Sequence, residues 1–119
     1  MSDDLRFQAA YNGLLTLANV ALRASGFRVS LSPGHHQRVI ESLEYTLTTQ
    51  DSDTRERWVR RIKAHSQKRN FASYDSAGGV SPSALKQIIR DLTALREQVD
   101  AWLRNTHPEF LGDEAGHGS

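Results

Sequence analysis

The residues best suited to chemistry lie in one basic stretch of the chain, between Arg55 and Asp75. From Arg55 to Arg69 there are seven Lys or Arg residues and a single acid, Glu56. The rest of the chain holds 8 basic and 13 acidic residues, although the whole chain has a net charge of only +1. Concentrated positive potential attracts polyanions. We therefore expect a polyanion-binding surface here. If the polyanion is RNA, these are the expected contact residues: Arg61, Lys68, Arg69 and Phe71.

The same stretch has the spacing of a helix with one inward face. Trp58, Ile62, His65 and Arg69 follow one another at offsets of four, three and four residues, so the face begins apolar and ends in two chargeable side chains. Arg69 is suited to stabilising charge that develops on a phosphate. His65 lies one turn earlier on that face, and we hypothesise that it supplies the proton-transferring group. The alternative is a structural histidine packed in the core.

Two aromatic residues, Phe71 and Tyr74, directly follow the basic run, and aromatic rings can stack on bases. A solvated basic helix face without a nucleic-acid partner is the alternative. No metal or other cofactor is expected. The chain has no cysteine and no HExxH motif, and the adjacent His35 and His36 point about 100° apart on a helix. We expect His36 to be a packed core or interface histidine.

Four helices are predicted from apolar spacing and end signals. The first begins after a Ser2 cap, with Asp3 and Asp4 in its first turn and apolar spacing from Leu5 to Ala24. It ends at Gly26, and Gly13 within it can permit a close helix approach. The second covers about 34–47 after a cap and proline at Ser32-Pro33, with Ile40, Leu43 and Leu47 joining His36 on its inward stripe.

The third helix is expected to begin at a Ser52 or Asp53 cap, with Glu56 placed for a capping box, and to continue or break near Asn70. The last runs from Ser81-Pro82 to about residue 104. Its apolar stripe comprises Leu85, Ile88, Leu92, Leu95, Val99 and Trp102. Its polar residues, Gln87 and Asp91 among them, are assigned to the opposite face. The prediction is an all-α antiparallel up-down bundle of four or five helices, one domain over residues 1–111 and a disordered tail over 112–119.

This layout resembles the HEPN domains (higher eukaryotes and prokaryotes nucleotide-binding), helical bundles of prokaryotic toxin–antitoxin, defence and RNA-processing proteins. The resemblance covers nearly the whole chain and rests on these segments: Ala10-Tyr11, Gly34-His35-His36, the basic third helix, Arg69-Asn70-x-x-x-Tyr74-Asp75, and the last helix ending near Trp102 and Pro108. Active members carry an R-x(4–6)-H motif. Arg69 and Asn70 match its first positions, and Tyr74 stands where the histidine of the shortest spacing would be.

The resemblance implies a homodimer whose cleft binds RNA and, in active members, cleaves it without metal. Arg69, Asn70 and Tyr74 are then candidate catalytic residues, with Tyr74 able to donate a hydrogen bond or stack. The spacing of His65 from Arg69 adds His65 as a candidate substitute for the motif histidine. Whether the chain is a ribonuclease stays open, because the motif histidine is replaced. The alternative is a non-catalytic HEPN module, or a helical adaptor, that binds a protein partner such as a nucleotidyltransferase-like antitoxin.

The expected location is the cytoplasm of a bacterium. The N-terminal Met1-Ser2-Asp3-Asp4 is acidic and lacks the apolar segment of a secretory signal. No apolar run approaches the roughly 18 residues of a membrane span, so no membrane partner is expected.

Overall fold

The protein is a bundle of helices in the computed structural model, which describes the backbone of residues 2–27, 34–74 and 80–111 and the side chains of 2–27, 34–68 and 80–110. Within these residues there is no strand. The elements, in chain order, are α1 (Asp3–Ala24), α2 (His35–Glu41), α3 (Leu43–Thr46), α4 (Ser52–Tyr74), α5 (Pro82–Thr106) and a 3-10 turn, η1 (Pro108–Leu111). The predicted all-α helical bundle is confirmed. The predicted tail, residues 112–119, lies outside the described part.

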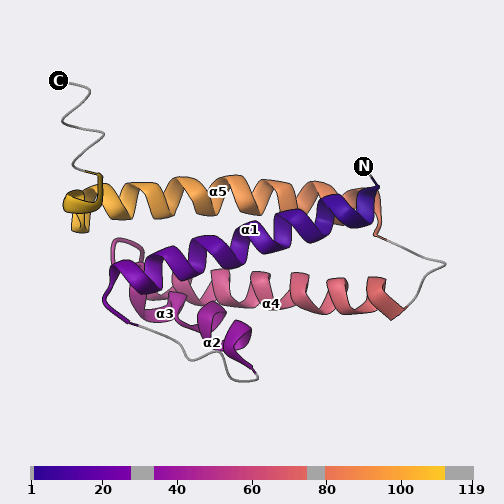
Figure 1. Ribbon diagram of the computed structural model, residues 1–119, viewed down its shortest axis with the longest axis horizontal. Helices are drawn as coiled ribbons and strands as arrows, with labels where there is room; N and C mark the ends of the chain where they lie inside the picture. Colours follow the sequence, from indigo (N-terminus) through magenta and orange to yellow (C-terminus); the bar gives the residue numbers. More distant parts are fainter. Residues whose placement is uncertain (1, 28–33, 75–79, 112–119) are drawn as a thin grey trace.

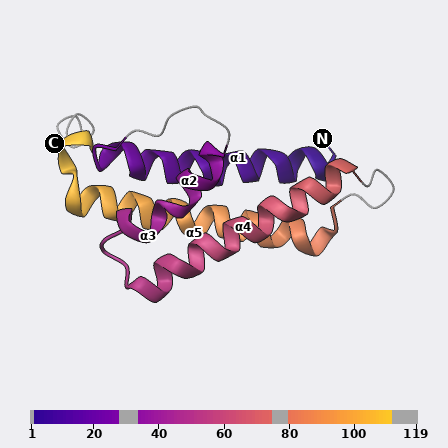
Figure 2. The ribbon, with the colours of Figure 1, turned by 90° about the horizontal axis from the view of Figure 1, so that it is seen from below.

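Three long helices form the body of the bundle. Helices α1 and α5 run in the same direction and α4 runs against both, while the short α2 and α3 lie along one side (Figure 1). The backbone of α1 closely approaches all four other helices, whereas α4 and α5 meet mainly through their side chains. The view from below shows α4 crossing obliquely under the other two long helices (Figure 2). Helix α1 is therefore central, and the space between α4 and α5 must be bridged by long side chains.

The N-termini of α1 and α5 are capped as predicted. The Ser2 hydroxyl accepts a hydrogen bond from the Leu5 N–H at 3.2 Å, and the Ser81 hydroxyl accepts one from the Ala84 N–H at 3.1 Å, with Pro82 at the first helical position. These bonds satisfy backbone donors that have no partner within a helix. The two ends are also joined, because the Val80 N–H donates to the Asp4 carboxylate at 2.8 Å.

Helix α1 ends in a Schellman motif around Gly26. The N–H of Phe27 donates to the Leu22 carbonyl at 3.2 Å, and the N–H of Gly26 donates to the Arg23 carbonyl at 2.9 Å. Gly26 has φ of +90°, a left-handed conformation that costs glycine little. The predicted stop is confirmed.

The predicted second helix is wrong as a single element, because the structure has two short helices separated at Ser42. The Ser42 hydroxyl donates to the Val39 carbonyl at 2.6 Å. In a continuous helix the N–H of Leu43 would use that acceptor, so the serine competes with the helical ladder. The predicted cap at Ser32-Pro33 lies outside the described residues, and the residue that precedes α2 is Gly34.

The predicted inward stripe of this segment holds for its apolar members only. Ile40, Leu43 and Leu47 are fully buried, but His36 is exposed. His36 lies in the first turn of α2, where the helix has not yet reached the core, and its ring lies 4.3 Å from that of His35. The expectation of a packed core histidine is therefore wrong within this chain.

Helix α4 begins one residue earlier than predicted and does not break near Asn70. Its cap is Asp51, whose carboxylate accepts the Thr54 N–H at 2.7 Å, so neither Ser52 nor Asp53 has this role. Hydrogen bonds from the side chain and backbone of Thr54 hold the pKa of the Asp51 carboxyl below its ordinary value. The backbone remains helical to Tyr74.

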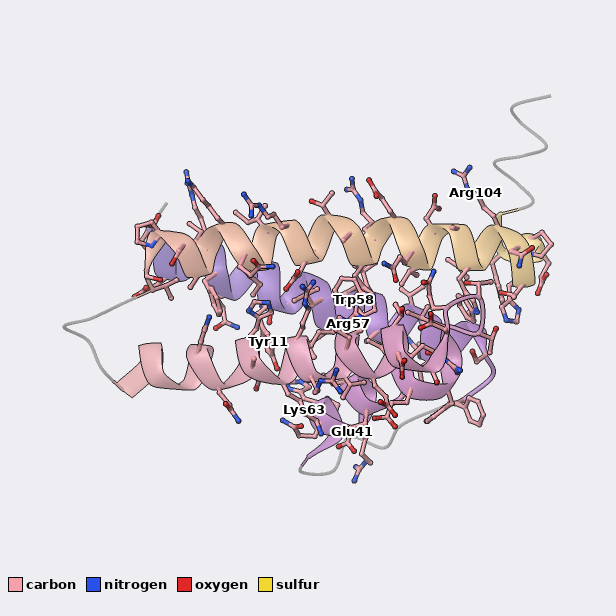
Figure 3. The ribbon with its side chains drawn as sticks, turned by 180° about the vertical axis from the view of Figure 1, so that it is seen from behind. Tyr11, Glu41, Arg57, Trp58, Lys63 and Arg104 are labelled. Carbon is pink, nitrogen blue, oxygen red and sulfur yellow. The ribbon has the colours of Figure 1, made fainter. Side chains whose placement is uncertain are left out.

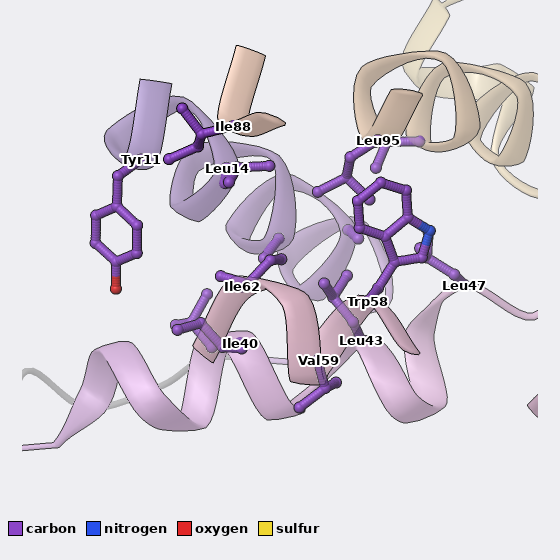
Figure 4. Close-up of a cluster of buried hydrophobic side chains, with 14 of the residues drawn as sticks. Tyr11, Leu14, Ile40, Leu43, Leu47, Trp58, Val59, Ile62, Ile88 and Leu95 are labelled. Atoms are coloured by element: carbon purple, nitrogen blue, oxygen red, sulfur yellow. The ribbon is translucent and has the colours of Figure 1, made fainter. Parts of the chain in front are cut away.

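The core lies where α1, α4 and α5 meet the two short helices (Figure 4). The following labelled side chains are all buried: Tyr11, Leu14, Ile40, Leu43, Leu47, Trp58, Val59, Ile62, Ile88 and Leu95. The predicted α5 stripe is buried except for the half-buried Leu92. Leu92 packs beside Gly13, where an added Cβ would lie 2.8 Å from its Cδ1. The close helix approach suggested for Gly13 is thus present, between α1 and α5.

Candidate nucleic-acid interface

A buried carboxylate, Asp91, joins α4 to α5 at the inner edge of the basic stretch. Its Oδ2 lies 2.7 Å from His65 Nε2, and its Oδ1 accepts hydrogen bonds from Arg61 Nη1 at 3.1 Å and Gln87 Nε2 at 3.0 Å. Both oxygens of Asp91 are therefore engaged, and three donors compensate the loss of hydration that burial imposes.

The burial of Asp91 corrects the prediction that Asp91 and Gln87 lie on the outer face of the last helix. Asp91 is only 2% exposed and Gln87 is half-buried. The signal was present in the spacing, because Asp91 lies three residues after Ile88 and four before Leu95 on the buried stripe. A carboxylate at such a position requires buried donors, and the basic third helix was the available source.

His65 is enclosed in the core, as its place on the inward stripe predicted. Its side chain is 4% exposed, and the edge of the Phe7 ring from α1 packs against it with ring centroids 6.0 Å apart. Nε2–H is the donor to Asp91, and Nδ1 has no hydrogen-bond partner among the described residues. In this conformation an external phosphate cannot reach the imidazole directly. A role for His65 in proton transfer stays a hypothesis.

Arg61 links the buried pair to the surface. Its side chain is 49% exposed, while the Asp91 side chain that it contacts is 3% exposed. The predicted RNA contact at Arg61 thus falls on a guanidinium that is held at one end by a buried acid and is open to solvent at the other. Such a bond orients a long side chain that would otherwise sample many rotamers.

The other basic residues of α4 whose side chains are described fall into two groups. Arg55 donates to the Glu44 carbonyl at 2.8 Å and Lys63 lies 3.7 Å from the Glu41 carboxylate, so both are tied to the short helices. Figure 3 shows Lys63 beside Glu41, with Arg57 away from that pair. The exposed residues Arg57, Arg60 and Lys68 make no ion pair with any described residue.

These three cations share one side of the helix with Arg61, because Arg60, Arg61 and Lys68 follow Arg57 by three, four and eleven residues. The row from Arg57 to Lys68 is about 16 Å long at the rise of an α-helix. We call the exposed side chains of Arg57, Arg60, Arg61 and Lys68 the α4 basic face.

The last predicted site residues are placed only by their backbone. Arg69, Asn70, Phe71 and Tyr74 lie in the final two turns of α4, directly after the α4 basic face. Their side chains lie outside the described residues, so the proposed Arg69–Asn70–Tyr74 constellation stays a prediction.

In the part of the chain that the structure describes, no three His, Asp or Glu side chains gather as metal ligands would, and no helix is long and apolar enough to cross a membrane. An exposed aromatic pair was not predicted from the sequence: Phe27, after α1, and Tyr45, in α3, have ring centroids 5.6 Å apart and are both about half exposed.

Comparison with known proteins does not assign the chain to a family. No protein-family model, curated protein or solved structure matches it. The resemblance to HEPN domains therefore rests on the sequence layout alone.

Proposed function

We propose that this protein binds RNA through the α4 basic face, as an HEPN-like component of a prokaryotic toxin–antitoxin, defence or RNA-processing system. The observation that carries the proposal is a row of three exposed cations, Arg57, Arg60 and Lys68, in which no side chain forms an ion pair with a described residue. Asp51, the cap of α4, attracts Arg57 across a longer distance, but the row as a whole stays exposed beside Arg61. A solvated row of this kind can exchange counterions for phosphates.

RNA cleavage is the catalytic extension of this proposal. Arg69 would stabilise charge on the phosphodiester, Asn70 and Tyr74 would donate hydrogen bonds, and two copies of the chain would form the cleft. His65 would serve as the titrating group only if the core opens, since Phe7 and Asp91 enclose it. No metal is required for this chemistry, because a cation and a proton-transferring group are supplied by side chains.

The binding test compares two triple variants with equal loss of charge. Arg57→Ala/Arg60→Ala/Lys68→Ala removes three of the four cations of the α4 basic face, and Arg6→Ala/Arg23→Ala/Arg96→Ala removes three exposed cations of α1 and α5. We expect the first variant to lose at least about tenfold in affinity for a labelled oligouridylate, with a shallower salt dependence, and the second to change far less. Equal losses would show attraction by overall charge and would overturn the proposed surface.

The catalytic test uses total RNA in EDTA, with the parent beside Arg69→Ala. Cleavage by the parent alone, leaving cyclic phosphate ends, would establish a metal-independent ribonuclease. His65→Ala would follow, and a folded variant that cleaves as fast as the parent would exclude a role for this histidine. Size measured over a concentration series tests the dimer, since a strict monomer could not form the two-chain cleft.

The second candidate function is a non-catalytic module that binds a protein partner. The exposed Phe27–Tyr45 pair favours it, since contacting exposed aromatic rings are enriched where proteins associate. Binding that depends on Phe27 and Tyr45, persists at high salt and needs no cation of α4 would support this alternative over RNA binding.

A further inference from the structure

We propose that Asp91 is a positioning residue that holds Arg61 ready to bind one phosphate of the RNA chain. This inference rests on the proposed RNA-binding function and names a specific contact within it. Neither the composition nor the spacing of the basic stretch distinguishes Arg61 from its neighbours. The tertiary structure does, because among the described cations of the α4 basic face only Arg61 is paired with a buried acid.

The anchor itself is held rigidly. Asp91 Oδ2 accepts a hydrogen bond from His65 Nε2. Asp91 Oδ1 accepts hydrogen bonds from Gln87 Nε2 and Arg61 Nη1. Gln87 lies one turn before Asp91 on α5, while His65 comes from α4. The carboxylate is therefore oriented by two helices, and the direction in which it faces Arg61 is set by the core.

The guanidinium has capacity left for a ligand. Arginine carries five N–H donors, and the structure shows one hydrogen bond from Arg61, between Nη1 and Asp91. About half of the side chain is exposed. The remaining donors can bind a phosphate as a fork while Asp91 holds the opposite side, an arrangement in which part of the rotamer entropy is lost before binding.

Arg57 is the natural comparison for Arg61. It lies one turn earlier on the same side of α4, carries the same charge, and has no ion pair with a described residue. A phosphate bound by Arg57 must order the whole side chain. Arg61 should therefore contribute more to affinity, even though Asp91 partly cancels its charge.

Charge alone predicts the opposite effect of removing the anchor. Asp91→Asn deletes one negative charge beside the α4 basic face, so simple electrostatics predicts tighter RNA binding. The positioning role predicts weaker binding, because the neutral amide holds the guanidinium less firmly and the fork loses its orientation. The sign of the change therefore separates the two explanations.

The experiment measures affinity for a labelled oligouridylate over a salt series, with urea unfolding to select folded variants. We expect Arg61→Ala to weaken binding about tenfold and to lower the salt slope by about one contact, against two- to threefold for Arg57→Ala. Asp91→Asn should weaken binding about threefold. In the Asp91→Asn protein, adding Arg61→Ala should lower the affinity no more than adding Arg57→Ala does. Tighter binding by Asp91→Asn, or equal losses from Arg61→Ala and Arg57→Ala, would overturn the inference.

Arg61→Lys keeps the test decisive if Asp91→Asn does not fold. It preserves the charge but lacks the fork, so we expect it to lose nearly as much affinity as Arg61→Ala, and parental binding would contradict the inference. The proposed function itself would be refuted if the parent did not bind RNA, or if its binding survived the combined loss of Arg57, Arg60 and Lys68. The positioning role alone would be refuted if binding needed those three cations but did not change in Asp91→Asn.

Discussion

His65 and Asp91, 26 residues apart in the chain, form a buried pair in which Nε2 and Oδ2 are 2.7 Å apart. This pair bridges α4 and α5 where their backbones make few close approaches. A second bridge lies further along, where the Trp58 indole N–H donates to the Gln98 side chain at 2.7 Å. The interface between these two helices is thus joined by polar bonds, whereas α1 is held to α5 by apolar packing.

Breaking the pair from one side should destabilise the protein strongly. In Asp91→Leu, the buried donor of His65 loses its acceptor, and we expect about 3 kcal/mol less free energy of unfolding. His65→Leu leaves the carboxylate with Arg61 and Gln87 and should cost less. The double variant should be more stable than the sum of the two losses predicts, which urea unfolding of all four proteins would measure. Strict additivity would show that the two side chains do not interact energetically.

The effect of Gly13→Ala on stability should depend on Leu92, which lies across the α1–α5 contact. In a Leu92→Ala background, Gly13→Ala has room and should stabilise by up to about 1 kcal/mol through helix propensity. In the parent the new methyl group would meet Leu92 Cδ1, so the side chain must move and the gain should be smaller. Thermal unfolding of the four proteins in this cycle checks the prediction, and an equal gain in both backgrounds would contradict the close approach.

Gly26 should resist replacement by residues with a side chain. Its φ of +90° is strained for alanine, so Gly26→Ala should lose about 1 kcal/mol of stability. Gly26→Asn is the matched control, because asparagine tolerates the left-handed region better and should lose less. Chemical denaturation distinguishes these variants. Identical stability of Gly26→Ala and the parent would argue against the observed end of α1.

The Asp51 cap should make stability depend on acid pH. Its folded-state pKa is lowered by the hydrogen bonds from Thr54, so the cap contributes fully above the ordinary pKa of about 4 and is lost as the pH falls through the lower folded value. Asp51→Asn retains an accepting cap but does not titrate. We expect the melting temperature of the parent to fall more than that of Asp51→Asn as the pH is lowered from about 5. Parallel pH profiles would show that the cap carries no such linkage.

The sequence by itself determined the helical class and most helix ends. Capping by Ser2 and Ser81 and the stop at Gly26 depend on hydrogen bonds within a few residues, so local chemistry suffices to predict them. The α5 stripe also follows from spacing alone. Local rules were ambiguous where three capping residues, Asp51, Ser52 and Asp53, stand in succession.

Only the tertiary structure decided which partners the buried polar residues have and which basic residues remain available. Asp91 faces His65 because of how α4 and α5 cross, and no local pattern encodes that approach. Arg61 is anchored while Arg57 is not for the same reason, although both have the same charge and lie on the same side of one helix. The spacing of residues along a helix gives the direction of each side chain around the helix axis. The partner of that side chain depends on which second helix the fold packs against it.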